Sequence, residues 1–115
     1  MFNVVFSNQG NLLAFAGDGC DNSIKLIDIS DLKKYNVEID LKGHTHWIYR
    51  LTFSNDSKYL ISGSGDYKII FWDVILKKES FQLNSESYVN GVAINSNDTL
   101  ITSNSDDGKI RIWTI

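Results

Sequence analysis

The chain has 115 residues, of which 43% are hydrophobic and 22% charged, a composition that suits one folded domain and excludes an intrinsically disordered chain. Its net charge of -3 and isoelectric point near 5.2 argue against a general nucleic-acid binder, because such proteins usually carry a basic patch. The single cysteine, Cys20, cannot form an internal disulfide, and no apolar run reaches the roughly 18 residues of a membrane-spanning helix. We therefore expect a cytoplasmic or nuclear protein without nucleic-acid or membrane partners.

Short strands separated by turns are predicted along the chain, and no segment shows a sustained helical period. Residues 54–57 and 95–98 are rich in Asn, Asp and Ser, which favour turns. Between residues 109 and 112, Lys and Arg alternate with Ile, which is the two-residue period of a strand. In chain order, the expected strands cover residues 2–6, 11–16, 23–29, 36–41, 48–53, 58–63, 68–74, 79–83, 89–94, 99–103 and 109–115.

These strands fall into three similar units. Residues 53–60 resemble both an earlier segment, 6–13, and a later one, 94–100. Trp72 and Trp113 lie 41 positions apart, and Ile27 lies 45 positions before Trp72. Periods of this length indicate a repeat architecture. We place the units, within a single domain of residues 1–115, at approximately residues 1–42, 43–84 and 85–115, the last of which ends before a fourth strand.

The second unit carries the most specific motif. Gly43-His44 precedes Trp72-Asp73 with 27 residues between them, and the segment 62–66 (SGSGD) lies within that interval. This pattern resembles the WD40 repeat, and the resemblance extends over nearly the whole chain. It implies an all-β fold without helices, namely a partial β-propeller of about 2.7 four-stranded antiparallel blades with eleven strands in total.

The resemblance also implies a structural tetrad of hydrogen-bonded side chains, formed by His44, Ser62, Asp66 and Trp72. The physical need is clear, because a buried indole N–H requires an acceptor and a buried carboxylate requires donors. An imidazole has two ring nitrogens and can bridge a carboxylate and a hydroxyl. Ser64 is the alternative source of that hydroxyl, although we favour Ser62.

The third unit keeps only part of this set. Ser103, Asp107 and Trp113 occupy the corresponding positions, but Asn84-Ser85 stands where the second unit has Gly-His. We therefore expect this unit to be only partly connected by polar contacts.

The first unit departs further from the pattern. Ile27 replaces the tryptophan, and of the tetrad only Asp21 remains. Apolar packing is expected to hold this unit together.

A cluster of Ser, His and Asp also invites comparison with a hydrolase triad. That alternative would use Ser62 or Ser64 with His44 and Asp66, and it needs an exposed nucleophile and an oxyanion hole. The sequence contains no Gly-x-Ser-x-Gly nucleophile elbow, and the two histidines lack a recognised metal-ligand spacing. We therefore favour the structural interpretation and expect no catalytic residues, no metal and no cofactor.

Two sequences, beginning at Asn55 and Asn97, have the form of glycosylation sites. Both occupy the same turn of their repeat units. Turn preference explains them better than modification.

By resemblance, the chain is a non-catalytic scaffold or interaction module that binds other proteins or peptides. The loops at the tetrad end of the units would form the contact surface, where aromatic side chains are favoured. The candidate partner-binding residues are His46, Trp47, Tyr49, Tyr67, Tyr88, Asn90 and Asp106.

Eleven strands fall short of a closed ring, so we expect the chain to be a fragment of a longer propeller. Alternatively, it is a structural segment that completes a propeller with other chains, or copies of it self-associate. In either case, uncovered apolar faces and an unpaired edge at residues 109–115 predict association of the isolated chain.

Overall fold

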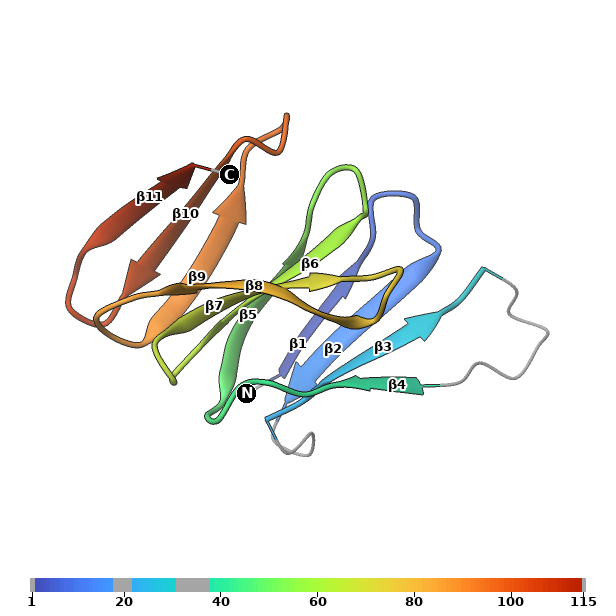
Figure 1. Cartoon of the computed structure of the whole chain (residues 1–115), viewed down its shortest axis with the longest axis horizontal. Coiled ribbons are helices and arrows are strands. Elements are labelled where there is room, and N and C mark those ends of the chain that lie inside the picture. Colours follow the sequence, from blue (N-terminus) through green and yellow to red (C-terminus); the bar gives the residue numbers. More distant parts are fainter. Residues whose placement is uncertain (1, 18–21, 31–37, 115) are drawn as a thin grey trace.

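The computed structural model describes residues 2–17, 22–30 and 38–114. All elements in these ranges are strands, so the predicted all-β fold with eleven strands is confirmed (Figure 1). Strands 2–6, 48–53 and 89–94 have the expected ends, and the ends of the others differ by at most two residues. Residues 36, 37 and 115 lie outside the described ranges. The strands are β1 (Phe2–Phe6), β2 (Leu12–Gly17), β3 (Ile24–Asp28), β4 (Glu38–Leu41), β5 (Ile48–Phe53), β6 (Tyr59–Ser64), β7 (Lys68–Asp73), β8 (Lys78–Asn84), β9 (Val89–Ile94), β10 (Leu100–Ser105) and β11 (Ile110–Thr114).

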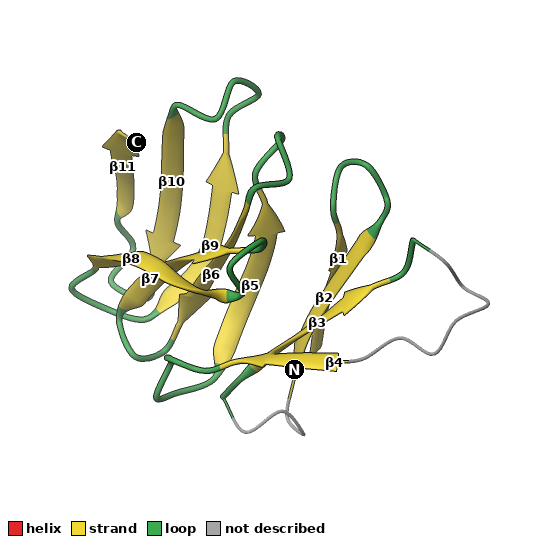
Figure 2. Ribbon diagram, turned by 45° about the vertical axis from the view of Figure 1, so that its right-hand side comes forward, coloured by secondary structure: helices red, strands yellow, loops and turns green. Residues whose placement is uncertain are grey.

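Each run of consecutive strands forms its own antiparallel sheet. The first sheet has the order β1-β2-β3-β4, the second β5-β6-β7-β8, and the third contains β9, β10 and β11 in the described part of the chain. The sheets lie side by side, and their first strands β1, β5 and β9 contact one another in sequence (Figures 1 and 2). Each sheet is therefore a local chain meander, and the three are joined by packing rather than by shared ladders.

Two apolar cores separate the three sheets. The core between the first and second sheets includes Leu26 and Leu41 on one side and Leu51 and Trp72 on the other. The core between the second and third sheets is smaller and includes Phe71 of β7 and Val89 of β9. The second sheet is consequently covered on both faces, which explains why its strands β6 and β7 are buried at nearly every position.

Gly63 sets the distance between the second and third sheets. A Cβ atom at this position would lie 2.6 Å from Cγ1 of Val89, which is closer than real contacts allow. The missing side chain lets β9 approach β6 directly.

Polar turns at one end of the sheets bind one another across the sheet boundaries. The carboxylate of Asp98 accepts hydrogen bonds from the backbone N–H groups of Asn55 (2.8 Å) and Asp56 (3.0 Å) and from the Asn55 side-chain amide (2.9 Å). Asn8 likewise donates its side-chain amide to the carbonyl of Asn55 at 3.2 Å. The Asn55 amide is thus engaged within the fold, as its predicted role in a turn requires.

The outer faces of the first and third sheets carry exposed apolar side chains. Val4 and Phe6 project from β1, and Ile110 and Ile112 project from β11 with 75% and 68% of their surfaces exposed. Because alternate residues of a strand point to opposite faces, these side chains lie opposite the cores described above.

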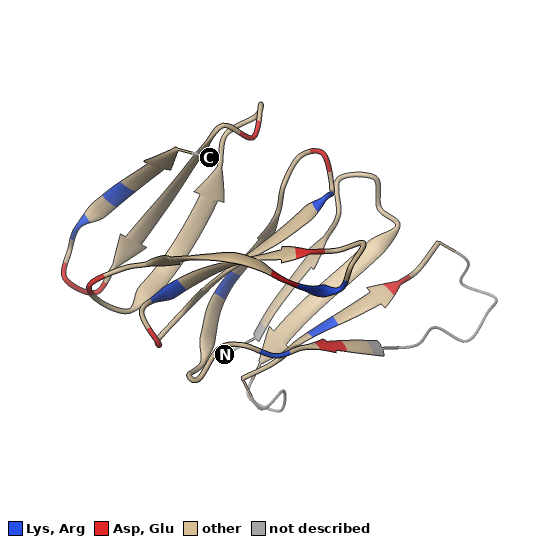
Figure 3. Cartoon of the chain, viewed as in Figure 1, with Lys and Arg blue, Asp and Glu red and all other residues tan. Residues whose placement is uncertain are grey.

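Charges of both signs are spread over all three sheets (Figure 3). Among the described residues, no helix is long and apolar enough to cross a membrane.

Candidate functional site

The second sheet brings four predicted residues into one hydrogen-bonded chain. His44 lies in the segment that leads into β5, and its Nδ1 is 2.9 Å from Oδ2 of Asp66 in the β6–β7 turn. Its Nε2 is 2.6 Å from Oγ of Ser62 on β6. The indole Nε1 of Trp72 on β7 donates to the same Oγ at 2.8 Å.

The donors in this chain can be assigned from simple chemistry. An indole N–H can only donate, so Ser62 must accept from Trp72. The serine proton is then free to be donated to Nε2 of His44, which leaves Nδ1–H to donate to the Asp66 carboxylate. With that tautomer, each polar group of these four side chains has a hydrogen-bond partner. A buried network that is fully hydrogen-bonded favours a single packing arrangement of the residues around it.

The Asp66 carboxylate has further donors. It accepts hydrogen bonds from the backbone N–H groups of Thr45 (3.0 Å) and Lys68 (3.0 Å). Burial raises the pKa of Asp66, but the hydrogen bonds from His44 and from these two N–H groups outweigh it, so the pKa lies below its ordinary value of 3.8. The carboxylate is therefore held in its charged form.

Gly43 supplies the space that the Trp72 ring fills. A Cβ at position 43 would lie 2.9 Å from Cη2 of Trp72, and the His44 and Trp72 rings meet edge to face at 6.1 Å. Gly43 thus leaves space for the Trp72 indole, and His44 connects Ser62 to the Asp66 carboxylate.

Of the two candidate serines, Ser62 lies between His44 and Trp72. Ser64 instead donates its hydroxyl to the backbone carbonyl of Trp47 at 2.8 Å. It ties the segment before β5 to the end of β6.

The partial set in the third sheet is only partly brought together. Trp113 Nε1 donates to Ser103 Oγ at 3.3 Å, which is longer than in the second sheet. Asp107 bonds to Arg111 at 2.9 Å, and this hydrogen bond lowers the pKa of Asp107 to about 2. Ser85, which stands at the histidine position, is buried, and its hydroxyl has no hydrogen-bond partner in the described part of the chain.

Arg111 was not singled out from the sequence. Its guanidinium also donates to Ser105 at 2.6 Å, so it connects the β10–β11 turn in place of a histidine. The sequence does place Asp107 and Arg111 four residues apart, but this spacing does not predict an ion pair when a turn lies between the two residues. In the first sheet, Ile27 is half-buried on β3, and Asp21 lies outside the described residues.

Five of the predicted partner-binding residues form an aromatic cluster, which we define as His46, Trp47, Tyr49, Tyr67 and Tyr88. The His46 ring stacks on Tyr88 with centroids 5.9 Å apart and also approaches Trp47 at 5.6 Å. Tyr67 meets Tyr88 edge to face at 5.5 Å. Trp47, Tyr67 and Tyr88 nevertheless expose 61%, 46% and 38% of their surfaces, so the cluster is ordered and accessible at once.

The remaining two predicted residues lie beside this cluster. The Asn90 side-chain amide donates to the Asp106 carboxylate at 2.6 Å, and both residues are exposed. Among the described residues, no three His, Cys, Asp or Glu side chains are placed to hold a metal ion.

Fold and site together define a class of protein. It is an all-β repeat protein, built in its described part from antiparallel sheets of three or four strands that pack face to face, in which buried hydrogen-bonded side chains connect the loops to the strands of one sheet.

Comparison with known proteins identifies the family within this class. A family profile described as "WD domain, G-beta repeat" matches residues 35–73 and 77–114. The 77 kDa echinoderm microtubule-associated protein of Strongylocentrotus purpuratus is 27% identical over 135 aligned positions, covering 94% of this chain and 19% of that protein. DDB1- and CUL4-associated factor 5 of Homo sapiens is 31% identical over 115 positions, covering 97% of this chain and 12% of that protein.

A third relative, echinoderm microtubule-associated protein-like 4 of Homo sapiens, is 39% identical over 70 positions, covering 60% of this chain and 7% of that protein. The chain thus spans less than a fifth of the length of each of these relatives. The two segments matched by the family profile cover more than half of the chain. The chain belongs to the WD40 family, and its three sheets are consistent with successive blades of a partial propeller.

Proposed function

We propose that this chain is a non-catalytic module that binds other proteins, and that the aromatic cluster is its contact surface. The observation that carries the proposal is the exposure of three large aromatic side chains that are already held in place by ring contacts. Pre-ordered aromatic side chains bury much area on binding and lose little conformational freedom, which is why they dominate interface hot spots.

The tetrad supports a structural rather than a catalytic role. Ser62 is fully buried, and its oxygen is bonded on both sides by Trp72 and His44. A hydrolytic nucleophile needs access to a substrate carbonyl and to an oxyanion hole. We propose that the tetrad orients the loops that present the aromatic cluster.

The relatives support the same class of function. Their names describe association with microtubules in two cases and with DDB1 and CUL4 in the third. We propose a cytoplasmic or nuclear location for this chain and a partner among the protein assemblies found there.

Affinity capture from cell extract tests the aromatic cluster. The comparison uses the unaltered chain, the double variant Trp47→Ala/Tyr67→Ala and the control Ile75→Ala/Leu76→Ala. The control removes two apolar side chains from the β7–β8 turn that are at least as exposed as Trp47 and Tyr67. Partners retained by the unaltered chain and the control should be lost from the cluster variant. Equal recovery by all three would remove the cluster as a contact surface.

A second candidate function rests on the exposed outer faces. Val4, Phe6, Ile110 and Ile112 form apolar surface of the kind that packs between sheets elsewhere in the molecule. We propose that these faces are covered by further blades, supplied by other copies or other chains. In sedimentation velocity, the unaltered chain should associate, and the variant Ile110→Lys/Ile112→Lys should not. If the unaltered chain and the variant were both monomeric at micromolar concentration, the proposal would be contradicted.

A further inference from the structure

Arg50 on β5 lies where two hollows of the surface meet. One, of about 420 Å³, runs along β9 and β10, and the other, of about 430 Å³, runs across β1, β5 and β9. Among the described residues that line either hollow, Arg50 is the one charged residue. Both linings therefore carry a positive formal charge, although the whole chain carries -3.

The Arg50 guanidinium has no partner among the residues that the structure describes. The side chain is exposed, and within the described ranges it takes part in no ion pair or hydrogen bond. Arg111, in contrast, is bonded to both Asp107 and Ser105. Arg50 thus retains the five N–H donors of a guanidinium for an external acceptor.

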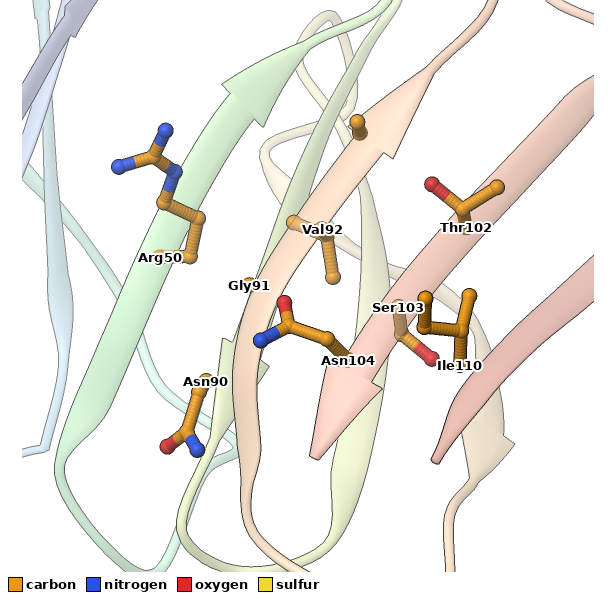
Figure 4. A pocket seen from close by; sticks show the side chains of 9 residues that line it. Arg50, Asn90, Gly91, Val92, Thr102, Ser103, Asn104 and Ile110 are labelled. Carbon is orange, nitrogen blue, oxygen red and sulfur yellow. The ribbon is translucent and has the colours of Figure 1, made fainter. Parts of the chain in front are cut away.

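Neutral hydrogen-bonding groups line the same hollow as Arg50. The Asn104 side chain reaches from β10 across β9 at Gly91, toward the side on which Arg50 lies (Figure 4). A Cβ atom at position 91 would collide with Oδ1 of Asn104, so the glycine makes this placement possible. Neither the Asn104 amide nor the Thr102 hydroxyl has a hydrogen bond to another described residue, and both line the first hollow.

One guanidinium among linings that are otherwise uncharged in the described part of the chain matches a ligand with one negative charge. A carboxylate accepts two parallel N–H bonds from a guanidinium, and the charges then cancel. A phosphate carries close to two charges and would leave one of them uncompensated in an acidic protein. We propose that Arg50, assisted by Asn104, binds the carboxylate of an acidic side chain in a partner peptide. The inference rests on the proposed protein-binding function but concerns a surface separate from the aromatic cluster.

A peptide titration followed by NMR tests this site in the full chain. The ligand is the blocked peptide acetyl-Gly-Glu-Gly-amide, with the Gln and phosphoserine versions as comparisons. The Glu peptide should cause saturable shifts of the Arg50 Nε–H, the Gly91 amide and the Asn104 side-chain amide. The shifts should weaken as salt is raised, because the pair is exposed to solvent.

Matched variants separate recognition from general charge attraction. Arg50→Gln should weaken Glu-peptide binding by about tenfold. Lys58→Gln removes the same charge from an exposed position outside both hollows and should leave binding unchanged. Gly91→Ala keeps all charges but displaces the Asn104 side chain, and it should also weaken binding.

Four outcomes would overturn the proposal. They are no shift with any peptide, equal shifts with the Gln peptide, tighter binding of the phosphoserine peptide than of the Glu peptide, and equal losses in the Arg50 and Lys58 variants. The aromatic-cluster variant Trp47→Ala/Tyr67→Ala should bind the Glu peptide normally. A negative result in the peptide titration would therefore not contradict the proposed role of the aromatic cluster, which the affinity capture tests separately.

Discussion

The second and third sheets share a repeat but are stabilised differently. In the second, His44 joins Asp66 to a serine that also accepts from Trp72, and apolar cores cover both faces. In the third, the hydrogen bond from Trp113 to Ser103 is longer, and the acidic residue Asp107 pairs with Arg111. One face of this sheet is exposed. Both burial and residue identity therefore distinguish the two sheets, because an indole N–H that is shielded from water requires a protein acceptor such as the serine hydroxyl.

The largest expected difference lies between the two tryptophans. Trp72→Ala removes a side chain that is 1% exposed and should lower the free energy of unfolding by about 3–5 kcal/mol. Trp113→Ala should cost clearly less, because the Trp113 side chain is only partly buried. Urea unfolding followed by far-ultraviolet circular dichroism measures both. Equal losses would show that the two sheets are equally dependent on their tryptophans.

The next test removes the bridge of the polar chain. His44→Ala leaves the Asp66 carboxylate and the Ser62 hydroxyl buried without their shared partner, and it should cost about 1–3 kcal/mol. The same urea experiment measures this loss. An unchanged unfolding midpoint would mean that the chain of hydrogen bonds contributes nothing to stability.

Acid should weaken the second sheet through Asp66. The folded-state pKa of Asp66 lies below its ordinary value of 3.8, so its contribution is complete above that value and is lost as the pH falls through the folded-state pKa. The stability difference between the unaltered chain and Asp66→Asn should therefore narrow between about pH 5 and pH 3. Thermal melts at these two pH values measure the change, and a constant difference would contradict the assignment.

The smallest effect is expected where the third sheet lacks its histidine. Ser85 is buried, and its hydroxyl bonds to no other residue in the described ranges, so Ser85→Ala removes a polar group without breaking a hydrogen bond seen there. We expect no loss and a gain of at most about 1 kcal/mol. Urea unfolding of this variant beside His44→Ala shows whether the two equivalent positions differ as the contacts indicate.

The fold could be predicted because the pattern that defines it is local. Turn clusters, alternating residues and the spacing from Gly43-His44 to Trp72 specify the strands and their repeat. The sequence also indicated which serine stands between His44 and Trp72.

Other features depend on distances between sheets, which sequence spacing does not encode. The stacking of His46 on Tyr88 joins the segment before β5 to the segment before β9. Arg50 and Arg111 look alike in the sequence, yet Arg50 borders two hollows without a bond to any described side chain, and Arg111 bonds to Asp107 and Ser105. Their environments are set by neighbouring strands, which only the structure shows.

The polar turns give the repeat a direction. The Asn8 side-chain amide donates to the Asn55 carbonyl, and Asn55 donates to the Asp98 carboxylate of the following unit. Every link therefore fastens an earlier segment to one that leaves the ribosome later. The units are thereby fastened to one another by polar contacts as well as by the apolar cores between them.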